Sequence, residues 1–529
     1  MSDEPRSTSF RRSLWTLAIL GVLTLPLVTP RIYASDEVQY FAYLRSLWFD
    51  RDVSFENEYQ HFYNAGIAQG AGFHETFLER TTETGRRINF GTIGAPLLWS
   101  PFYAAANLWA QARYASGAKI ATDGYSQPYI AAVAYGSAFY GWTALALTLL
   151  IIRRILGDAR LGPVLAIWLG TPLIFYMLIA PPMAHACSAF AIALFIYVWL
   201  NARERWSARD LIALGAAAAL MTMVREQDAF VAVGPALDWG WTVVRRWRAR
   251  TPTVTASTAT PTATETASAA AREDGVGRLL INGAIGAAAF FVCFLPQLAC
   301  YLALNGYPGP SRLVGRKMNW MTPHAGGVLL SPEHGLLFWS PLIVLSLAGL
   351  ALLTLSRDAR VPTRPPADAV APDAAPPDAA HAVLAPAARR WIGVCLLAIV
   401  AAEVYVAGSV ESWTVAGAFG QRRFVGLSVV FSIGLAALWL RTRTPIHRAL
   451  VGVLAALCIW WNIGLMAQFG LGLMDRQRLT LRANAYHTFV TIPRLLPDLM
   501  RRYVFERRSF YRTPAAPAAA PGRGDVRPQ

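Results

Sequence analysis

The sequence predicts an all-α, polytopic integral membrane protein with about eleven transmembrane helices, joined in places by juxtamembrane or re-entrant helices. Three observations support this class. The chain of 529 residues is 55% hydrophobic and only 15% charged, and its mean hydropathy is positive, as expected of a protein that spans a bilayer. Apolar stretches long enough to cross recur along the chain. Short arginine runs flank these stretches, where they orient helices in the membrane.

The formal net charge of +16 could indicate nucleic-acid binding, but the arginines gather beside apolar stretches and not on one basic face. We therefore expect no nucleic-acid partner. All five cysteines lie in apolar stretches without the spacing of metal ligands. They are typical of small buried hydrophobic residues and not of disulfides.

The first apolar run, 14–30, lies between arginines on both sides and fits either a secretory signal or a retained helix. Cleavage after Ala34 would leave Ile32 at a position that prefers small residues, so we expect retention and keep cleavage as the alternative. Retention places the N-terminal arginines in the cytoplasm and the loop 32–87 on the opposite side of the membrane.

Ten further stretches can cross, which makes eleven crossings. They lie near 125–152, 160–180, 183–201, 209–224, 228–244, 279–303, 336–355, 391–409, 424–440 and 449–472. Alternating crossings place the arginine runs of the membrane body on the same side as the N-terminus, which satisfies the positive-inside rule. The stretch 88–112 is also apolar, but a crossing there would reverse these assignments. We predict that it is re-entrant or interfacial and that Pro96 and Pro101 break it.

Composition divides the chain around two linkers. The predicted units are an N-terminal membrane block with the loop 32–87 (1–244), a cytoplasmic linker (245–278), a middle helix pair (279–355), a disordered cytoplasmic linker (356–390), a C-terminal membrane block (391–472) and a basic tail (473–529). One linker is rich in Thr and Ala, the other in Pro, Ala and Asp. Parity places the tail outside, although an interfacial helix near 485–500 or a further crossing would change that side.

Two acids, Asp36 and Glu37, directly follow the first crossing. If Ser35 caps a helix, these acids only complement the helix dipole. Helical spacing also puts Tyr40 on the same face as Asp36, beside the bilayer. A carboxylate held there could act as a general base toward an acceptor hydroxyl.

Cationic residues in three other outer loops could bind a phosphate. Arg225 lies between two apolar segments, where a guanidinium needs an anion, a partner acid or a path to the interface. Arg422 and Arg423 open a later helix and could instead bind anionic headgroups. Arg316 and Lys317 could be ordinary loop charges. Together with one acid, these cations describe a site for a phosphate leaving group, because guanidinium can hold phosphate through two hydrogen bonds.

The spacing of the candidate ligands does not predict a metal site. Four acids of the first loop could bind a divalent cation, but a solvated acidic loop is the simpler interpretation; they are Asp50, Asp52, Glu56 and Glu58. The histidines, among them His334, lack the spacing of ligands. No cofactor is predicted, and a divalent metal stays open.

Six groups of short motifs resemble the GT-C superfamily of membrane glycosyltransferases, of the protein O-mannosyltransferase and aminoarabinose-transferase type. In chain order they are Asp36–Tyr40, Phe49–Asp52 with Asn57–Tyr59, Asn89–Pro96, Val224–Gln227, Ser331–Leu337 and Phe419–Arg423. They are scattered along the whole membrane body, and the ordered set is more specific than the acidic pair alone.

The resemblance implies a GT-C-like bundle whose first extracytoplasmic loop contains juxtamembrane helices, and a donor sugar carried on a polyprenyl phosphate. It places the catalytic role on Asp36. Taken with the loop residues above, the candidates are Asp36 and Glu37 for catalysis, Arg225, Arg422, Arg423, Arg316 and Lys317 for the donor phosphate, and Tyr40, Glu58 and His334 for contacts with the substrate.

The chain departs from the better-known members in lacking an obvious large soluble C-terminal domain, and no acceptor motif matches. We predict a glycosyltransferase of the bacterial cytoplasmic (inner) membrane with an extracytoplasmic active site, which moves a sugar from a polyprenyl-phosphate donor to a cell-envelope glycan, lipid or protein. The alternatives are a transporter or flippase for a lipid-linked sugar, and a non-catalytic assembly subunit. The sugar, the acceptor and the oligomeric state are not predicted.

Overall fold

The computed structural model is helical throughout the part of the chain that it describes. The described residues are 4–67, 72–158, 160–248, 263–355, 383–415 and 417–506. Helices make up 76% of the structure, and these residues form no strand. The predicted all-α class is confirmed.

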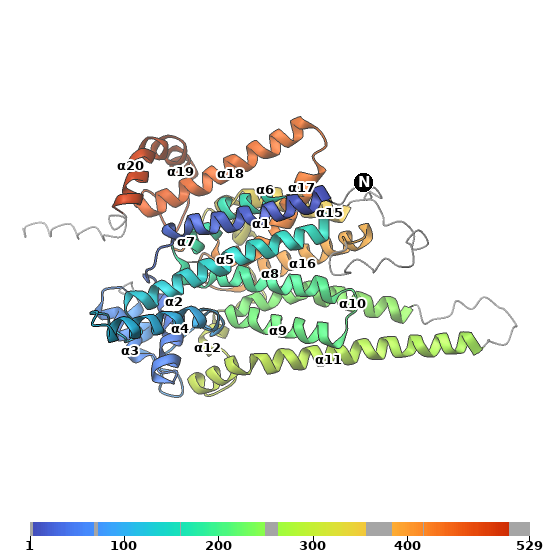
Figure 1. The fold of residues 1–529 in the computed structure, drawn as a ribbon, viewed down its shortest axis with the longest axis horizontal. Coiled ribbons are helices and arrows are strands. Elements are labelled where there is room, and N and C mark those ends of the chain that lie inside the picture. Colours follow the sequence, from blue (N-terminus) through green and yellow to red (C-terminus); the bar gives the residue numbers. More distant parts are fainter. Residues whose placement is uncertain are drawn as a thin grey trace, which may run out of the picture.

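The long helices lie side by side along the long axis of the molecule (Figure 1). They are α1 (Glu4–Thr24), α5 (Gln127–Leu156), α8 (His185–Ala202), α9 (Ala208–Val224), α10 (Val233–Arg248), α11 (Ala263–Asn305), α16 (Pro386–Ser409), α17 (Ser428–Arg441) and α18 (Pro445–Leu471). Shorter helices complete the bundle: α6 (Leu161–Gly170), α7 (Leu173–Leu178), α14 (Leu336–Trp339) and α15 (Leu342–Leu355). A helix therefore lies in each of the eleven stretches predicted to cross.

Among the described residues, seven helical segments are long and apolar enough to cross a membrane. They are Phe10–Leu27, Gln127–Leu156, His185–Ala202, Gly275–Asn305, Pro386–Ser409, Arg422–Arg441 and Pro445–Leu471. α6 and α15 are apolar but shorter, and α9 and α10 have only 17 and 16 residues, whereas a crossing needs about 20. The structure supports a membrane protein with several spans, and the number eleven stays a prediction.

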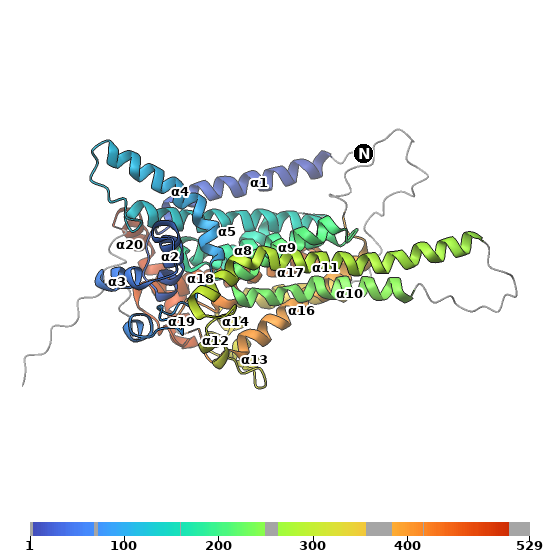
Figure 2. The same cartoon turned by 90° about the horizontal axis from the view of Figure 1, so that it is seen from below.

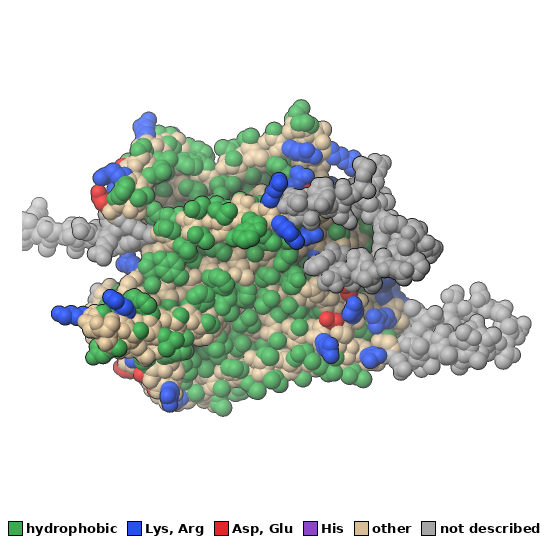
Figure 3. All heavy atoms as spheres, viewed as in Figure 1, with side chains coloured by type: hydrophobic (Ala, Val, Ile, Leu, Met, Phe, Trp, Pro, Cys, Tyr) green, Lys and Arg blue, Asp and Glu red, His purple; other side chains and the backbone are tan. Residues whose placement is uncertain are grey.

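Apolar side chains form a band across the middle of the visible face, and charged side chains gather toward its two ends (Figure 3). Many large hydrophobic residues of the long helices are exposed, among them Trp15, Phe291 and Leu457. A contiguous apolar surface of this kind favours hydrocarbon over water. The band is where a bilayer would surround the molecule.

The segment 88–112 does not form a broken re-entrant structure. It contains most of one continuous helix, α4 (Gly94–Ala115), with Pro101 in its interior. Proline lacks the amide that would bond the carbonyl of Leu97, and the hydroxyl of Ser100 donates to that carbonyl at 2.7 Å instead. The break predicted at the prolines is therefore wrong. α4 packs on α5 and on the first-loop helix α2 (Ser35–Arg45) (Figure 2).

The elements of the first predicted loop gather at one end of the bundle, here called the loop end. They are α2 (Ser35–Arg45), η2 (Ser46–Asp50), α3 (Glu56–Asn64) and η3 (His74–Glu79). Four more helices lie toward the same end (Figures 1 and 2): α12 (Arg312–Arg316), α13 (Ala325–Leu330), α19 (Leu481–Tyr486) and α20 (Ile492–Phe505). The N-terminus lies at the opposite end, so the helices of the tail share an end with the first loop.

The two predicted linkers overlap helices. α10 ends at Arg248 and α11 begins at Ala263, so 245–278 is helical at both of its ends. In 356–390, α16 begins at Pro386. Alanine-rich sequence forms helices readily, and both predicted linker ranges include helical residues at their ends. Residues 249–262 and 356–382 of these linkers, and residues 507–529 of the tail, lie outside the described residues.

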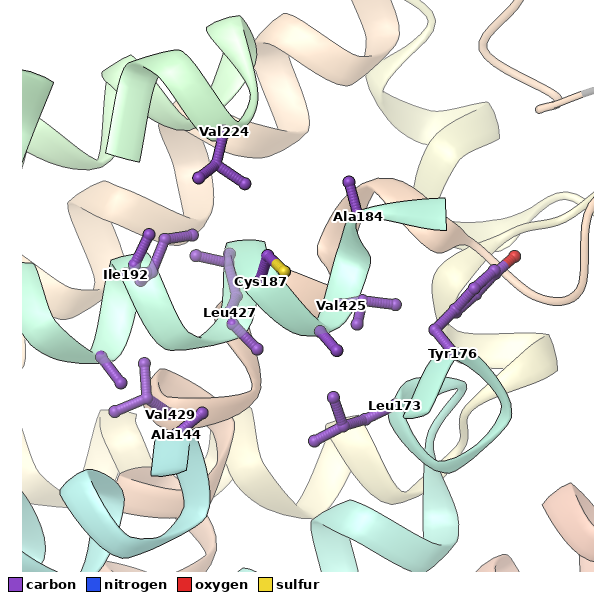
Figure 4. Packing of buried hydrophobic residues seen from close by; sticks show 14 of the residues in the cluster. Ala144, Leu173, Tyr176, Ala184, Cys187, Ile192, Val224, Val425, Leu427 and Val429 are labelled. Atoms are coloured by element: carbon purple, nitrogen blue, oxygen red, sulfur yellow. The ribbon is translucent and has the colours of Figure 1, made fainter. Parts of the chain in front are cut away.

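A buried apolar cluster joins the helices near the loop end. Cys187 of α8, Val224 of α9 and Val429 of α17 are among its members (Figure 4). Residues far apart in the sequence meet here, and close packing fixes the ends of their helices relative to one another. The candidate site is built on these fixed ends.

Candidate functional site

A cavity of about 550 Å³ lies at the loop end of the bundle. Its lining comes from separate parts of the chain: α2, residues 90–92, the start of α8, the turn after α9, the loop before α13, the end of α16 and the start of η8 (Arg422–Leu427). Four lining residues are cationic and two are acidic, namely Arg225, Lys317, Arg422, Arg423, Asp36 and Glu226. The cavity is a concave and mainly cationic site at the end of apolar helices.

Asp36 lies at the second position of α2, where a carboxylate is stabilised by the partial positive charge of the helix N-terminus. Its Oδ2 accepts a hydrogen bond from Nη1 of Arg422 at 2.5 Å, and its side chain is 38% exposed. The helix dipole accounts for an acid at this position. It does not account for an ion pair with a residue 386 positions away.

Glu37 lies outside the cavity and is fully buried. Its Oε2 accepts hydrogen bonds from the backbone amides of Tyr33 at 2.7 Å and Ala34 at 3.1 Å, amides for which the helix itself offers no acceptor. Burial raises the pKa of Glu37 to about 8, against the opposing effect of the two amides. Glu37 therefore caps α2 and does not face the cavity. The N-cap residue is Ala34, so a cap by Ser35 is wrong.

Tyr40 follows Asp36 by one helical turn and also lines the cavity. Its ring lies edge-on to Trp99, with centroids 6.4 Å apart, and a Cβ at Gly91 would lie 3.4 Å from its Cδ1. Burial raises the pKa of Tyr40 to about 12. The hydroxyl therefore stays protonated at neutral pH and can donate a hydrogen bond to a ligand.

Arg422 and Arg423 enter the cavity from a turn fixed by Gly420 and Gln421. Gly420 has a φ of +64°, and a Cβ there would lie 2.4 Å from Cγ of Pro172, so the turn requires glycine. The buried amide of Gln421 donates to two backbone carbonyls, both at 3.1 Å. The two arginines follow directly.

Arg423 is held by backbone and amide groups. Its Nη2 donates to the carbonyl of Ser412 at 3.1 Å, and its Nη1 lies 3.4 Å from Oε1 of Gln227. Nε2 of Gln227 donates to the carbonyl of Arg423 at 3.0 Å and to Oε2 of Glu403 at 3.4 Å. Glu403 is buried within α16 and lies close enough to Arg225 and Arg423 to interact with them electrostatically.

Arg225 directly follows α9 in an extended conformation. The start of α4 anchors this point, because Thr92 donates to the carbonyl of Val224 at 3.0 Å and a Cβ at Gly94 would lie 2.3 Å from the backbone of α9. Nη1 of Arg225 is 3.9 Å from Oδ1 of Asp228, which is a charge contact but too long for a hydrogen bond. The partner acid considered from the sequence is present, yet it leaves this nitrogen without a hydrogen bond.

Glu226 lines the cavity beside Arg225. The hydroxyl of Tyr301 donates to its Oε1. Burial raises the pKa of Glu226 to about 7. The charge of this carboxyl, and with it the net charge of the cavity, therefore changes near neutral pH.

The loop after α11 brings Lys317 to the cavity but not Arg316. An isolated bridge joins Met318 to Val410 and ties this loop to the residue after α16. The ammonium of Lys317 lies 5.9 Å from the centroid of the Phe90 ring, within the range of a cation–π contact. Arg316 is exposed and outside the lining.

Two further candidates lie away from the cavity. Glu58 is buried and accepts a hydrogen bond from Nη1 of Arg45 at 3.0 Å, and burial raises its pKa to about 7. Nε2 of His334 lies 2.8 Å from the carbonyl oxygen of Ala418, and its ring stacks on Trp339 with centroids 4.6 Å apart. The partners of both residues are not part of the cavity lining, so the structure does not place Glu58 and His334 in contact with a ligand there.

No group of three or more His, Cys, Asp or Glu side chains among the described residues could hold a metal ion. The first-loop acids have other partners: Asp50 and Glu58 pair with Arg45, and Glu56 pairs with Arg87. A divalent metal stays untested.

His185 and Glu403 are not among the site residues that the sequence predicted. His185 begins α8 and lines the cavity, with its ring centroid 4.4 Å from that of Tyr176. Glu403 interrupts an apolar helix, and a lone ionisable residue in such a stretch indicates a functional site. Glu403 thus carried a sequence signal that could have found it. His185 carried no signal beyond its place at a helix start.

The arrangement places a carboxylate, a phenol hydroxyl and four cations around one cavity. Such a set can bind an anionic group and accept a proton beside it. Compared with models of protein families, with curated proteins and with solved structures, the chain matches none. The GT-C resemblance therefore stays an expectation.

Proposed function

We propose that the protein is a membrane glycosyltransferase that moves a sugar from a polyprenyl-phosphate donor to an extracytoplasmic acceptor. The observation that carries the proposal is the convergence of Asp36 with Arg225, Arg422 and Arg423 on one cavity. A lipid-linked donor keeps its tail in the bilayer and its phosphate and sugar at the surface. A cationic cavity at the end of apolar helices suits such a donor, because arginines near the membrane need an anion and the donor phosphate would supply it there.

In the proposed reaction, Asp36 takes the proton of an acceptor hydroxyl or amine while the acceptor atom bonds to the anomeric carbon. The bond from that carbon to the phosphate oxygen breaks, and its electron pair stays on the phosphate. A single displacement inverts the anomeric centre. Phosphate is a good leaving group, so the reaction needs no protonating acid.

The charges of the cavity favour the leaving group. A phosphodiester donor carries one negative charge, and the released monoester carries about two at neutral pH. Four cations against two acids stabilise the second charge as it develops, and an interaction that strengthens in the transition state lowers the barrier. Arg422 also holds Asp36 at 2.5 Å, so one arginine positions the base.

We place the cavity on the extracytoplasmic face of a bacterial inner membrane. Arg153 and Arg154 lie in the last turn of α5, and Arg245, Arg246 and Arg248 in the last turn of α10. These helix ends lie away from the loop end (Figure 1), and basic residues mark the cytoplasmic side. The acceptor would then be a glycan, lipid or protein of the cell envelope.

The direct test is to incubate the purified protein, in lipid nanodiscs, with a polyprenyl-phosphate sugar and an envelope extract as the source of acceptor. The proposal expects release of polyprenyl phosphate together with a glycosylated product. In proteoliposomes, movement of intact donor between leaflets without cleavage would instead identify a transporter. Donor that is neither bound nor cleaved would identify an assembly subunit.

A further inference from the structure

His185 is a polar side chain inside the cavity with no partner of its own. It is 4% exposed, it lines the cavity, and neither ring nitrogen has a hydrogen-bond partner among the described residues. The ring of Tyr176 meets the imidazole edge-on at 66°, and the Tyr176 hydroxyl donates to the carbonyl of Phe419 at 3.0 Å and makes no hydrogen bond with His185. A buried imidazole without a hydrogen bond costs free energy unless a ligand supplies the missing partner.

The same residue begins a long helix. α8 runs for 18 residues from His185, so the first amides of the helix have no helical acceptor and carry a partial positive charge. Ala184 precedes it, at the edge of the apolar cluster (Figure 4). The helix N-terminus and the buried imidazole are two independent features that favour an anion at this wall of the cavity.

Two arginines of the cavity also have N–H groups without a hydrogen-bond acceptor. Nη1 of Arg225 and Nε of Arg423 are buried and have no hydrogen-bond partner among the described residues. These two guanidinium groups, and that of Arg422, lie close enough to His185 to act on it electrostatically. Arg422 differs, because it is already paired with Asp36.

We infer that His185, the N-terminus of α8, Arg225 and Arg423 form the seat of the donor phosphate, and that Arg422 mainly positions Asp36. This inference rests on the proposed function and divides the arginines of that site between two tasks. One ring N–H of His185 donates to a non-bridging phosphate oxygen, and the arginines donate to the others. The imidazole thereby fixes the depth of the phosphate in the cavity.

The test measures binding of a short-chain polyprenyl phosphate to the full chain in nanodiscs by titration calorimetry. His185→Phe keeps the ring but removes the donor, so affinity should fall about tenfold or more. His185→Gln keeps an amide donor and should stay within about threefold of wild type. Cys187→Ala is the matched control, because Cys187 lies in the same helical turn but belongs to the apolar cluster (Figure 4), and it should bind as wild type does.

Equal affinity of His185→Phe and wild type would contradict the assignment of His185 to the phosphate seat. If His185→Phe does not fold, the wild-type protein still decides, through the ring-nitrogen NMR signals of ¹⁵N-labelled histidine, assigned with His185→Gln. Polyprenyl phosphate should shift the signals of His185 and leave those of buried His334, which lies outside the cavity, in place. Unmoved His185 signals would overturn the seat as well.

The two proposals fail in distinguishable ways. Wild-type protein that binds no polyprenyl phosphate and cleaves no donor removes the proposed function. Wild-type protein that does both, while His185→Phe binds equally well, removes only the seat.

Discussion

Arg422 and Arg225 have the same side chain but meet different partners at the cavity. Arg422 donates to Asp36 at 2.5 Å, whereas Nη1 of Arg225 lies 3.9 Å from Asp228. A guanidinium engaged in a short ion pair is occupied, and one that lacks a hydrogen-bond partner remains available to a ligand. Substitution of these two arginines should therefore affect different steps.

Arg225→Ala should weaken binding of polyprenyl phosphate about 10-fold to 100-fold, because a hydrogen bond to a charged group contributes about 1.5–3 kcal/mol. Titration calorimetry in nanodiscs measures the change. Arg316→Ala is the control, since Arg316 is exposed and outside the cavity, and its affinity should match wild type. Equal affinities for both variants would remove Arg225 from the site.

Donor binding should weaken as the pH rises, and Glu226 should be responsible. Its pKa of about 7 makes the carboxyl neutral below that pH, where the cavity is most cationic, and charged above it, where it repels the donor. Between about pH 6 and about pH 8 the affinity for a sugar phosphodiester, whose own charge is constant there, should fall about fivefold. In Glu226→Gln the affinity should be flat over this range. A wild-type slope that persists in Glu226→Gln would assign the effect to another group.

At the scale of elements, the site depends on how the start of α4 meets the end of α9. Thr92 and Gly94 hold the backbone just before Arg225, and Gly420 sets the turn that brings in Arg422. The sequence predicted helices in the apolar stretches because hydropathy and length report a crossing directly. It did not predict that α4 is continuous through Pro101. The carbonyl of Leu97 is satisfied by the hydroxyl of Ser100, and a single local hydrogen bond of this kind produces no recognisable sequence pattern.

Gly94→Ala should destabilise the protein by about 1–3 kcal/mol, because its Cβ would lie 2.3 Å from the α9 backbone and the two elements must separate. It should also weaken donor binding, since Arg225 moves with that backbone. Thermal unfolding in detergent and calorimetry measure the two effects. Gly240→Ala, in α10 with open space around its Cβ, should be neutral or slightly stabilising. A Gly94 variant as stable as the Gly240 variant would contradict this account of the α4–α9 contact.

At the scale of the whole molecule, the loop between α1 and α4 and the helices of the tail lie at one end, and the N-terminus lies at the other (Figure 1). The division of the chain into loops and apolar stretches could be predicted from the sequence, since charge and hydropathy vary along the chain. It could not show which loop residues meet, because contacts such as Asp36 with Arg422 join positions 386 apart. For the same reason Glu58 and His334 had no visible partner in the sequence, although Arg45 and Ala418 engage them.

Cysteine labelling in intact cells should assign the two ends to the two sides of the membrane. Glu75→Cys in η3 and Arg494→Cys in α20 should react with a membrane-impermeant maleimide, and His447→Cys in α18 should react only after permeabilisation. The five native cysteines are buried or half-buried, which keeps the background low. Protection of Glu75→Cys in intact cells would place the cavity on the cytoplasmic side.

The most direct test of the central claim is turnover of a polyprenyl-phosphate sugar by Asp36→Asn. Asparagine keeps the size of the side chain but cannot accept the proton, so transfer should fall at least about 100-fold while donor affinity should not fall. Release of polyprenyl phosphate and donor binding are measured on the same nanodisc preparation. Wild-type turnover by Asp36→Asn would contradict the account.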